Sequence, residues 1–195
     1  MNQKTNEERL GTAPLGRLMV SLAVPAVAAQ LINILYNIVD RVYIGHIRDY
    51  GDIALTGVGV TFPIIMLISA FSAFAGMGGA PLASIELGKK DIRKAELILG
   101  NSAGMIVLFS IVLTIGFSIF KRPVLYAFGA SDATIGYAES YVAIYLVGTI
   151  FVQTAIGLNT FISGQGESKI AMLSVVIGAV LNICLDPLLI FVLGM

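Results

Sequence analysis

The stretch LILGNSAGMIVLFSIVLTIGFSIF, residues 97–120, contains no Asp, Glu, Lys or Arg. A helix needs about 20 mostly apolar residues to cross the hydrocarbon core of a bilayer, and this stretch is longer than that. The whole chain has the same character, because 57% of its 195 residues are hydrophobic and 12% are charged, with a mean hydropathy of +0.90. Soluble domains carry roughly a quarter charged residues. We therefore predict an integral membrane protein.

Four other windows are apolar and long enough to cross a membrane. The five predicted spans cover about residues 18–44, 54–83, 97–120, 141–162 and 170–193. The predicted fold is an all-α bundle of about five transmembrane helices over residues 18–195, preceded by a tail over residues 1–17. We expect the run Gly76, Gly78 and Gly79 to interrupt the second span, although membrane helices tolerate glycine. The pattern AVAAQ in the first span resembles a signal-peptide cleavage site, but the apolar run continues past it, so we expect the span to be retained.

The distribution of Lys and Arg sets the orientation of membrane helices, because cytoplasmic loops carry an excess of these residues. One side of the predicted bundle would hold Lys4, Arg9, Arg17, Lys89, Lys90, Arg93, Lys94 and Lys169. The other side would hold fewer, namely Arg41, Arg48, Lys121 and Arg122. We therefore expect a multi-pass protein of a bacterial-type plasma membrane, with a cytoplasmic N-terminus and, after five spans, Met195 outside.

Several function classes find no support in the composition. The formal net charge is zero, so bulk electrostatics do not favour a nucleic-acid partner. Cys184 is the only cysteine and His46 the only histidine, which excludes an internal disulfide, a cysteine cluster and a multi-histidine metal site. No nucleophile–base pair is recognisable, so we do not expect an enzyme.

Two acidic residues lie inside predicted spans. Asp40 and Asp186 fall late in the first and fifth spans, which both run outward, so at about 1.5 Å per residue they reach a similar depth in the outer half of the membrane. An ionised Asp at a helix centre costs about 2.5–3.5 kcal/mol on insertion scales, so such residues face a partner or a water-filled interior. We expect the two acids to face one cavity. The alternative for Asp40 is an interfacial position in which Arg41 neutralises it.

Further oxygen atoms accompany the two acids. Asn182 precedes Asp186 by one helical turn, and Pro187 lacks the N–H that would bond the carbonyl of Ile183. Carboxylate, amide and carbonyl oxygens suit a hard cation such as Na⁺, and desolvated carboxylates can instead carry H⁺. The coupling ion, H⁺ or Na⁺, is the only cofactor that we expect. Possible cavity-lining residues are Gln30, Asn33, Tyr36, Asn37 and Asn159. For Asn159 an interhelical hydrogen bond is an equal alternative.

Four segments resemble the multidrug and toxic compound extrusion (MATE) family. LYNIVDRVYIGH resembles the end of its first helix, and FPIIMLISAFSAFAGMGGAPLASIELGKKD resembles its second helix and the loop that follows. GLNTFISGQGESK and LNICLDPLLIF resemble the end of its fourth helix and its fifth helix. Ser163 stands where many relatives carry an arginine. The resemblance covers nearly the whole chain.

The resemblance implies an antiporter that uses H⁺ or Na⁺ entry to export organic, often cationic, compounds. It also implies that Asp40, Asn182 and Asp186 form the cation site of the N-terminal lobe. Because members of the family are about twice as long, with two lobes, it implies an N-terminal fragment that lacks the sixth helix and the C-terminal lobe. Such a fragment is expected to need the missing half, or a second chain, to transport.

Two other functions remain open. A flippase for lipid-linked oligosaccharides belongs to the same superfamily, but it would favour cationic residues for pyrophosphate, whereas the intramembrane charges here are chiefly acidic. A non-transporting half-protein that serves as an assembly subunit is the second. The expected partners are membrane lipid and small organic solutes.

Overall fold

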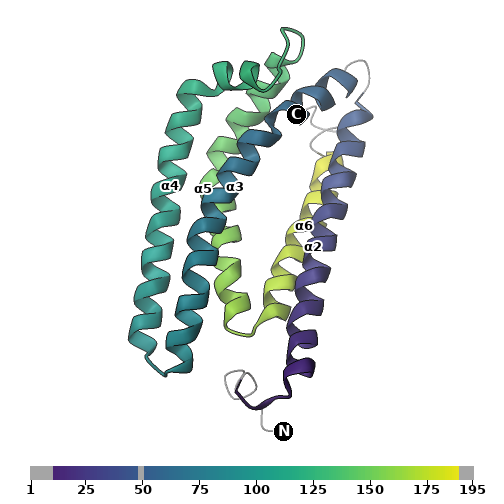
Figure 1. Cartoon of the computed structure of the whole chain (residues 1–195). Coiled ribbons are helices and arrows are strands. Elements are labelled where there is room, and N and C mark those ends of the chain that lie inside the picture. The colour runs from purple at the N-terminus through teal and green to yellow at the C-terminus, as the bar shows by residue number, and fades with distance from the viewer. Residues whose placement is uncertain (1–10, 48–50, 189–195) are drawn as a thin grey trace.

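The computed structural model describes residues 11–47 and 51–188. All of the long elements in these ranges are α-helices (Figure 1), and they are α2 (Leu15–Gly45), α3 (Gly51–Gly88), α4 (Ile92–Ala127), α5 (Ile135–Gly164) and α6 (Ser168–Pro187). Each of the five is long and apolar enough to cross a membrane. The predicted all-α fold with about five spans is therefore confirmed. The end of the fifth predicted span, residues 189–193, lies outside the described residues.

The helices extend beyond the apolar windows from which they were predicted. The largest difference is in α4, which begins five residues before the predicted span and ends seven residues after it. The added turns contain Arg93, Lys94, Lys121 and Arg122, and Lys and Arg are good helix formers that also suit the polar edge of a membrane. Hydropathy identifies the part of a helix that lies in lipid, so a prediction from hydropathy underestimates the length of the helix.

The five helices form two groups. Figure 1 shows α3, α4 and α5 side by side, with α2 and α6 as a pair next to them. Within the pair α2 packs closely on α6, whereas it touches α3 only sparsely. Successive helices run in opposite directions, so α2 and α6 run in the same direction (Figure 1). This arrangement brings the first and last described helices together.

Small residues let α3 and α5 approach closely. A Cβ atom added at Gly76 of α3 would lie 2.7 Å from the backbone oxygen of Gly157 in α5, closer than real contacts allow. A Cβ atom at Gly157 would in turn collide with Ile106 of α4. The expectation that the glycine run interrupts the second span is wrong, because α3 is continuous through it. Gly76 and Gly79 serve helix packing instead, whereas a Cβ atom at Gly78 would meet nothing within 4 Å.

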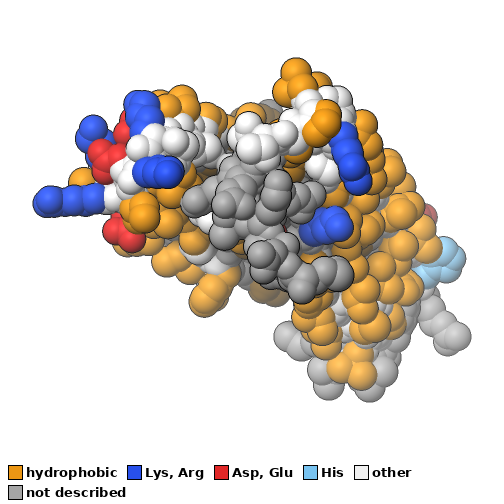
Figure 2. Space-filling model, turned by 90° about the horizontal axis from the view of Figure 1, so that it is seen from below, with side chains coloured by type: hydrophobic (Ala, Val, Ile, Leu, Met, Phe, Trp, Pro, Cys, Tyr) orange, Lys and Arg blue, Asp and Glu red, His pale blue; other side chains and the backbone are white. Residues whose placement is uncertain are grey.

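Large apolar side chains cover the flanks of the bundle. Examples are Val147 and Phe151 of α5, which are 79% and 77% exposed. Figure 2, a view along the bundle from below, shows hydrophobic side chains around the sides and clusters of Lys and Arg at the end. A surface of this kind suits lipid on the sides and water at the ends.

The core of the three-helix group contains a polar side chain without a partner. Gln153 of α5 is fully buried, and its backbone oxygen accepts a hydrogen bond of 2.6 Å from the hydroxyl of Ser72 in α3. Among the described residues, neither the Oε1 nor the Nε2 atom of Gln153 has a hydrogen-bond partner. A buried amide of this kind costs about 1–3 kcal/mol.

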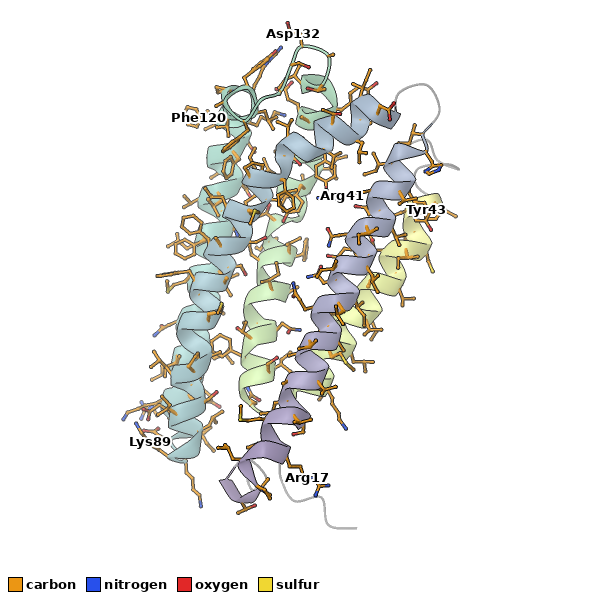
Figure 3. All side chains as sticks on the ribbon, turned by 45° about the vertical axis from the view of Figure 1, so that its right-hand side comes forward. Arg17, Arg41, Tyr43, Lys89, Phe120 and Asp132 are labelled. Atoms are coloured by element: carbon orange, nitrogen blue, oxygen red, sulfur yellow. The ribbon has the colours of Figure 1, made fainter. Side chains whose placement is uncertain are left out.

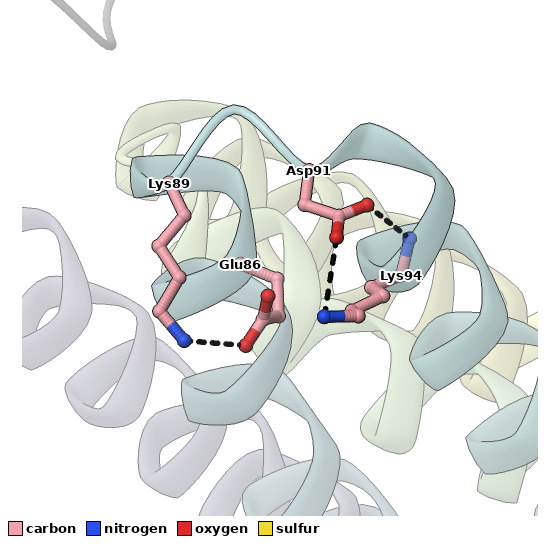
Figure 4. A network of polar contacts seen from close by, with 4 residues as sticks. All are labelled: Glu86, Lys89, Asp91 and Lys94. Carbon is pink, nitrogen blue, oxygen red and sulfur yellow. Dashed lines mark hydrogen bonds and ion pairs between the residues drawn. The ribbon is translucent and has the colours of Figure 1, made fainter.

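The turn between α3 and α4 is held by two ion pairs (Figure 4). Lys89 Nζ lies 2.7 Å from Glu86 Oε1, and Lys94 Nζ lies 3.3 Å from Asp91 Oδ2. Asp91 is also the N-cap of α4, since its Oδ1 atom accepts from the backbone N–H of Lys94 at 3.1 Å. That hydrogen bond, with the positive charges of Lys94 and Lys89, holds the pKa of Asp91 below its ordinary value. The carboxylate therefore fixes the start of α4.

The unpartnered amide predicts that Gln153→Met stabilises the protein. Methionine has nearly the same shape, so the variant keeps the packing and removes the cost of the buried amide, a gain of about 1 kcal/mol. The midpoint of thermal unfolding in detergent should rise. Ser72→Ala is the control, because it deletes a hydrogen bond and should lower the midpoint. A lower midpoint for Gln153→Met would mean that the amide is satisfied.

The N-cap predicts that Asp91→Ala lowers the thermal midpoint while Asp91→Asn retains most of it, because Asn also caps helices. Since the pKa of Asp91 is lowered by folding, the carboxylate stabilises the fold above its ordinary pKa of 3.8. That stabilisation is lost as the pH falls through the lower folded value. Unfolding followed by circular dichroism at pH 7 and pH 3 tests this. A stability gap between the unmutated chain and Asp91→Ala that is as large at pH 3 as at pH 7 would contradict it.

Candidate functional site

The periodicity of α2 places Asp40 on the face that packs against α6. The less exposed positions of α2 recur every three or four residues, at Leu18, Leu22, Pro25, Ala29, Ile32, Tyr36, Asp40 and Ile44. Asn182 and Asp186 of α6 lie one turn apart and are likewise partly buried. Because α2 packs along α6, the acids of both helices lie at one interface.

The two acids are neighbours. The carboxyl group of Asp186 lies close enough to that of Asp40 for direct repulsion when both are ionised and for a hydrogen bond when one is protonated. The structure thus brings together two residues that are far apart in the sequence. The two acids lie at the contact between α2 and α6, and the expected cavity that they face stays a prediction.

Asn182 completes this cluster and leaves two oxygens available. Its Nδ2 atom donates to Asp186 Oδ1 at 3.0 Å. Within the described part of the chain, Asn182 Oδ1 and Asp186 Oδ2 are buried without a hydrogen-bond partner. Buried acceptors normally have partners. Two free acceptors beside a second carboxylate can take up a proton or coordinate a hard cation.

Tyrosine side chains adjoin the acids. The phenol of Tyr141 in α5 lies within electrostatic reach of Asp40, Tyr36 and Tyr145. Tyr145, one turn further along α5, lies near Tyr36 and near Ser69 of α3. Tyr141 thus places a partly buried ring near Asp40, with Tyr36 and Tyr145 next to it.

The remaining predicted lining residues do not form one continuous stripe. Asn33 is partly buried with Asp40, whereas Gln30 and Asn37 are exposed beside that face. Asn37 donates to the backbone oxygen of Asn33 at 2.7 Å and to its Oδ1 atom at 3.1 Å. Asn159 of α5 donates across to α6, to the backbone oxygen of Ala171 and to Ser174 Oγ. Asn159 therefore forms an interhelical hydrogen bond, which was the alternative to a cavity-lining role.

Sequence reasoning missed three aromatic residues near the acids. Tyr141 and Tyr145 are one turn apart, and this spacing was the available signal. No signal pointed to Phe62, whose ring receives the guanidinium of Arg41 at 5.5 Å from its centroid. Among the described residues Arg41 forms no ion pair with Asp40, but it lies within electrostatic reach of that carboxyl group, so the alternative in which Arg41 neutralises Asp40 stays a prediction.

The oxygen atoms of this site come from two carboxylates and an amide. Over residues 11–47 and 51–188, no three His, Cys, Asp or Glu side chains gather as a metal-binding group. The site therefore differs from a cage of carboxylates for a divalent ion. Two carboxylates and an amide oxygen are groups that can take up a proton or a monovalent cation.

Comparison with known proteins identifies the family. The MatE family model matches residues 25–188, which include Asp40, Asn182 and Asp186. The chain belongs to the MatE family. Its fold and its length correspond to the N-terminal lobe of a MATE transporter.

Relatives with this fold are multidrug exporters and other transporters. The chain is 26% identical over 175 residues to the multidrug export protein MepA of Staphylococcus haemolyticus, covering 90% of this chain and 38% of that protein. It is 23% identical over 183 residues to an FAD transporter of Shewanella oneidensis, covering 94% of this chain and 40% of that one. The MatE chain thus spans about 40% of the length of these relatives.

Solved structures share the arrangement of helices. A crystal structure of MATE in complex with MaD3S matches the whole of this chain with a TM-score of 0.87 at 25% identity, and 43% of that chain is covered. A MOP superfamily transporter from Pyrococcus furiosus matches with a TM-score of 0.88 at 25% identity, covering 100% of this chain and 42% of that one. The two-group arrangement of helices is therefore that of membrane transporters.

The contact between the two carboxyl groups predicts coupled effects on stability. Asp40→Asn and Asp186→Asn should each raise the thermal midpoint at neutral pH, because each removes a partly buried charge and the same repulsion. The free energy of unfolding of the double variant should rise by about 1 kcal/mol less than the sum of the two single-variant gains. The reason is that the repulsion between the two carboxyl groups can be removed only once. Asp186→Asn combined with Asp132→Asn, an exposed acid distant in the chain, is the control and should be additive. Additivity of the Asp40 and Asp186 variants would show that the carboxyl groups do not interact.

Proposed function

We propose that this MatE chain contains the cation site of an antiporter that exports organic, often cationic, solutes in exchange for H⁺ or Na⁺. The observation that carries the proposal is the contact of Asp40 with Asp186, together with the unpartnered oxygens of Asn182 and Asp186. The whole transporter's activity and substrates belong to this proposal, because the chain spans about 40% of its relatives.

The site supports exchange through its charge. When both carboxyl groups are ionised, two negative charges at the edge of the membrane favour binding of a positive solute. When a proton or Na⁺ binds, that attraction falls and the solute is released. A ligand shifts an equilibrium only through its differential affinity for two states, and here the ion and the solute compete for the same charge.

The aromatic rings beside the acids support organic solutes. Tyr36, Tyr141 and Tyr145 offer flat apolar faces with a polar edge, and ring faces attract organic cations. The named relatives include multidrug exporters and an FAD transporter, so family membership leaves the solute class open. Among the described residues, this site contains no feature that points to a hydride-transfer or group-transfer enzyme.

The proposal includes an orientation and partners. Lys89, Lys90, Arg93 and Lys94 lie together at the α3–α4 turn, at the same end of the bundle as Arg17 (Figures 2 and 3). The positive-inside rule then places this end and the N-terminus in the cytoplasm of a bacterial-type cell. The partners are lipid, the solute and a second lobe, supplied by further sequence or by another chain.

Ethidium binding to the purified chain in lipid nanodiscs tests the function. We expect Asp186→Asn to weaken binding at least tenfold, because one of the two charges that attract the dye is lost, and to abolish its displacement by acid or by Na⁺. Asp132→Asn is the control and should behave as the unmutated chain. The ion that displaces the dye identifies the coupling ion. Unchanged binding and displacement in Asp186→Asn would refute the proposal.

Efflux from cells tests whether this lobe transports without a second one. Cells that express the chain alone should retain ethidium as control cells do, because alternating access requires two bundles around a site. Time courses of ethidium fluorescence, with membrane insertion of the chain checked by immunoblot, measure this. Export by the chain alone would show that it forms a complete transporter by itself.

A further inference from the structure

The turn between α3 and α4 contains a lysine where the backbone favours glycine. Lys90 has a φ of 63°, and among the described residues it is the only residue other than glycine with a positive φ. This left-handed region is unfavourable for side chains, because a Cβ atom crowds the backbone there and glycine has none. The turn requires this φ because α3 ends in a Schellman motif. The N–H of Lys90 donates to the backbone oxygen of Leu87, and the N–H of Asp91 donates to that of Glu86, both at 2.9 Å.

Two other helices end in the same motif, but with glycine at the left-handed position. Gly129 follows α4 with a φ of 99°, and Gly166 follows α5 with a φ of 83°. In both places the N–H of the next residue donates five residues back, as that of Asp91 does after α3. The chain thus has glycine at two equivalent turns and a strained lysine at the third. Backbone strain of this kind clusters at functional sites, which makes the side chain of Lys90 a candidate for binding.

Lys90 and Arg93, here called the basic pair, carry positive charge that the turn does not neutralise. Both side chains are exposed. Lys89 and Lys94, the other two cations of the turn, are each paired with an acid (Figure 4). Within the described part of the chain, no ion pair is formed by the basic pair or by Glu96, which is the next acid along α4. The basic pair is therefore available to an external anion.

The basic pair lies where the surface of a membrane would meet the bundle. The uncharged stretch of α4 begins at Leu97, so Arg93 precedes it by about 6 Å along the helix. Apolar side chains adjoin the cations, since Ile92 is 62% exposed and Leu97 is 58% exposed. Exposed apolar residues beside cations are typical of the boundary between acyl chains and lipid headgroups. Phosphate groups of lipids lie at this boundary.

We propose that Lys90 and Arg93 bind the phosphate of an anionic phospholipid, of the phosphatidylglycerol type, in the leaflet at this end of the bundle. A guanidinium binds phosphate oxygens through two N–H groups, and the lysine ammonium adds a point charge. Clusters of Lys and Arg next to a membrane helix attract anionic lipids in general. Figure 3 shows this turn, at Lys89, far from Arg41, which is the neighbour of Asp40. The inference is therefore independent of the proposed cation site.

Competition between two lipids tests the site. The chain in detergent is mixed with equal amounts of phosphatidylglycerol and phosphatidylcholine, and native mass spectrometry gives the ratio of the two lipids bound. Lys90→Gly and Arg93→Gln should each lower the preference for phosphatidylglycerol about fivefold, which is the contribution of one cation near an anionic surface. Lys90→Arg should retain the preference. The matched control combines Lys121→Gln with Arg122→Gln, two cations at the other end of α4, and should change the preference less than twofold.

Lys90→Gly also shows whether the lysine is needed for the lipid or for the turn. Its thermal midpoint in phosphatidylcholine should rise, because glycine adopts the left-handed conformation without strain. A variant that is more stable and yet binds phosphatidylglycerol less well cannot owe that loss to misfolding. A lower midpoint for Lys90→Gly would mean that the side chain supports the turn itself, and the proposal would be wrong.

Three further outcomes would overturn the proposal. The double variant of Lys90→Gly and Arg93→Gln could keep the lipid preference, in which case the basic pair binds no lipid. An equal loss in the control at the other end of α4 would reduce the effect to total charge. Free glycerol 3-phosphate should not displace the bound phosphatidylglycerol, because it has no acyl chains to lie beside Ile92. Displacement would assign the basic pair to a soluble phosphate instead of a lipid.

Discussion

The packing of α2 along α6 is the contact on which the candidate site depends. It joins the first and the last described helices, which run in the same direction and meet along the face that contains Asp40. No other contact in the described structure supplies two carboxyl groups to one place in the membrane. If this pair separated, Asp40 and Asp186 would become two isolated acids, each with its own desolvation cost.

The pair and the three-helix group are built in different ways. In the group, glycines and buried side chains join α3, α4 and α5 closely, as at Gly76, Gly157 and Ile106. In the pair, the interface contains polar atoms that lack partners, at Asn182 and Asp186. Unpartnered polar atoms weaken a contact in lipid, and both units contain them, since Gln153 of the group also lacks a partner among the described residues. What is particular to the pair is that its unpartnered oxygens lie beside a second carboxyl group, that of Asp40.

The charges of the site are of both signs. Asp40 and Arg41 are consecutive in the sequence, yet they point to different neighbours: Asp40 to Asp186 of α6 and Arg41 to Phe62 of α3. Consecutive residues on a helix project about 100° apart, so one position contributes to the helix pair and the next faces the three-helix group. The site is thus wider than the acid pair alone.

Much of the fold was predictable because membrane helices are specified locally. Long apolar windows identified all five helices, and only their ends were misplaced, since helices such as α4 continue through Lys and Arg beyond the lipid. The three residues of the acidic cluster were also predictable, because an acid is rare in such a window and Asn182 lies one turn from Asp186. The aromatic residues around them were not, since tyrosine and phenylalanine are ordinary in membrane helices.

The sequence by itself determined that the described part of the chain forms five membrane helices, with acids in the first and the last of them. Tertiary structure decided which residues meet: it brought Asp186 to Asp40, bonded Asn159 to α6 and turned Arg41 onto Phe62. The reason is that hydropathy and helical periodicity are properties of neighbours along the chain. Contacts between α2, α3 and α6 depend on how helices far apart in the sequence pack. Periodicity predicts which face of a helix is buried but not which other helix packs against that face.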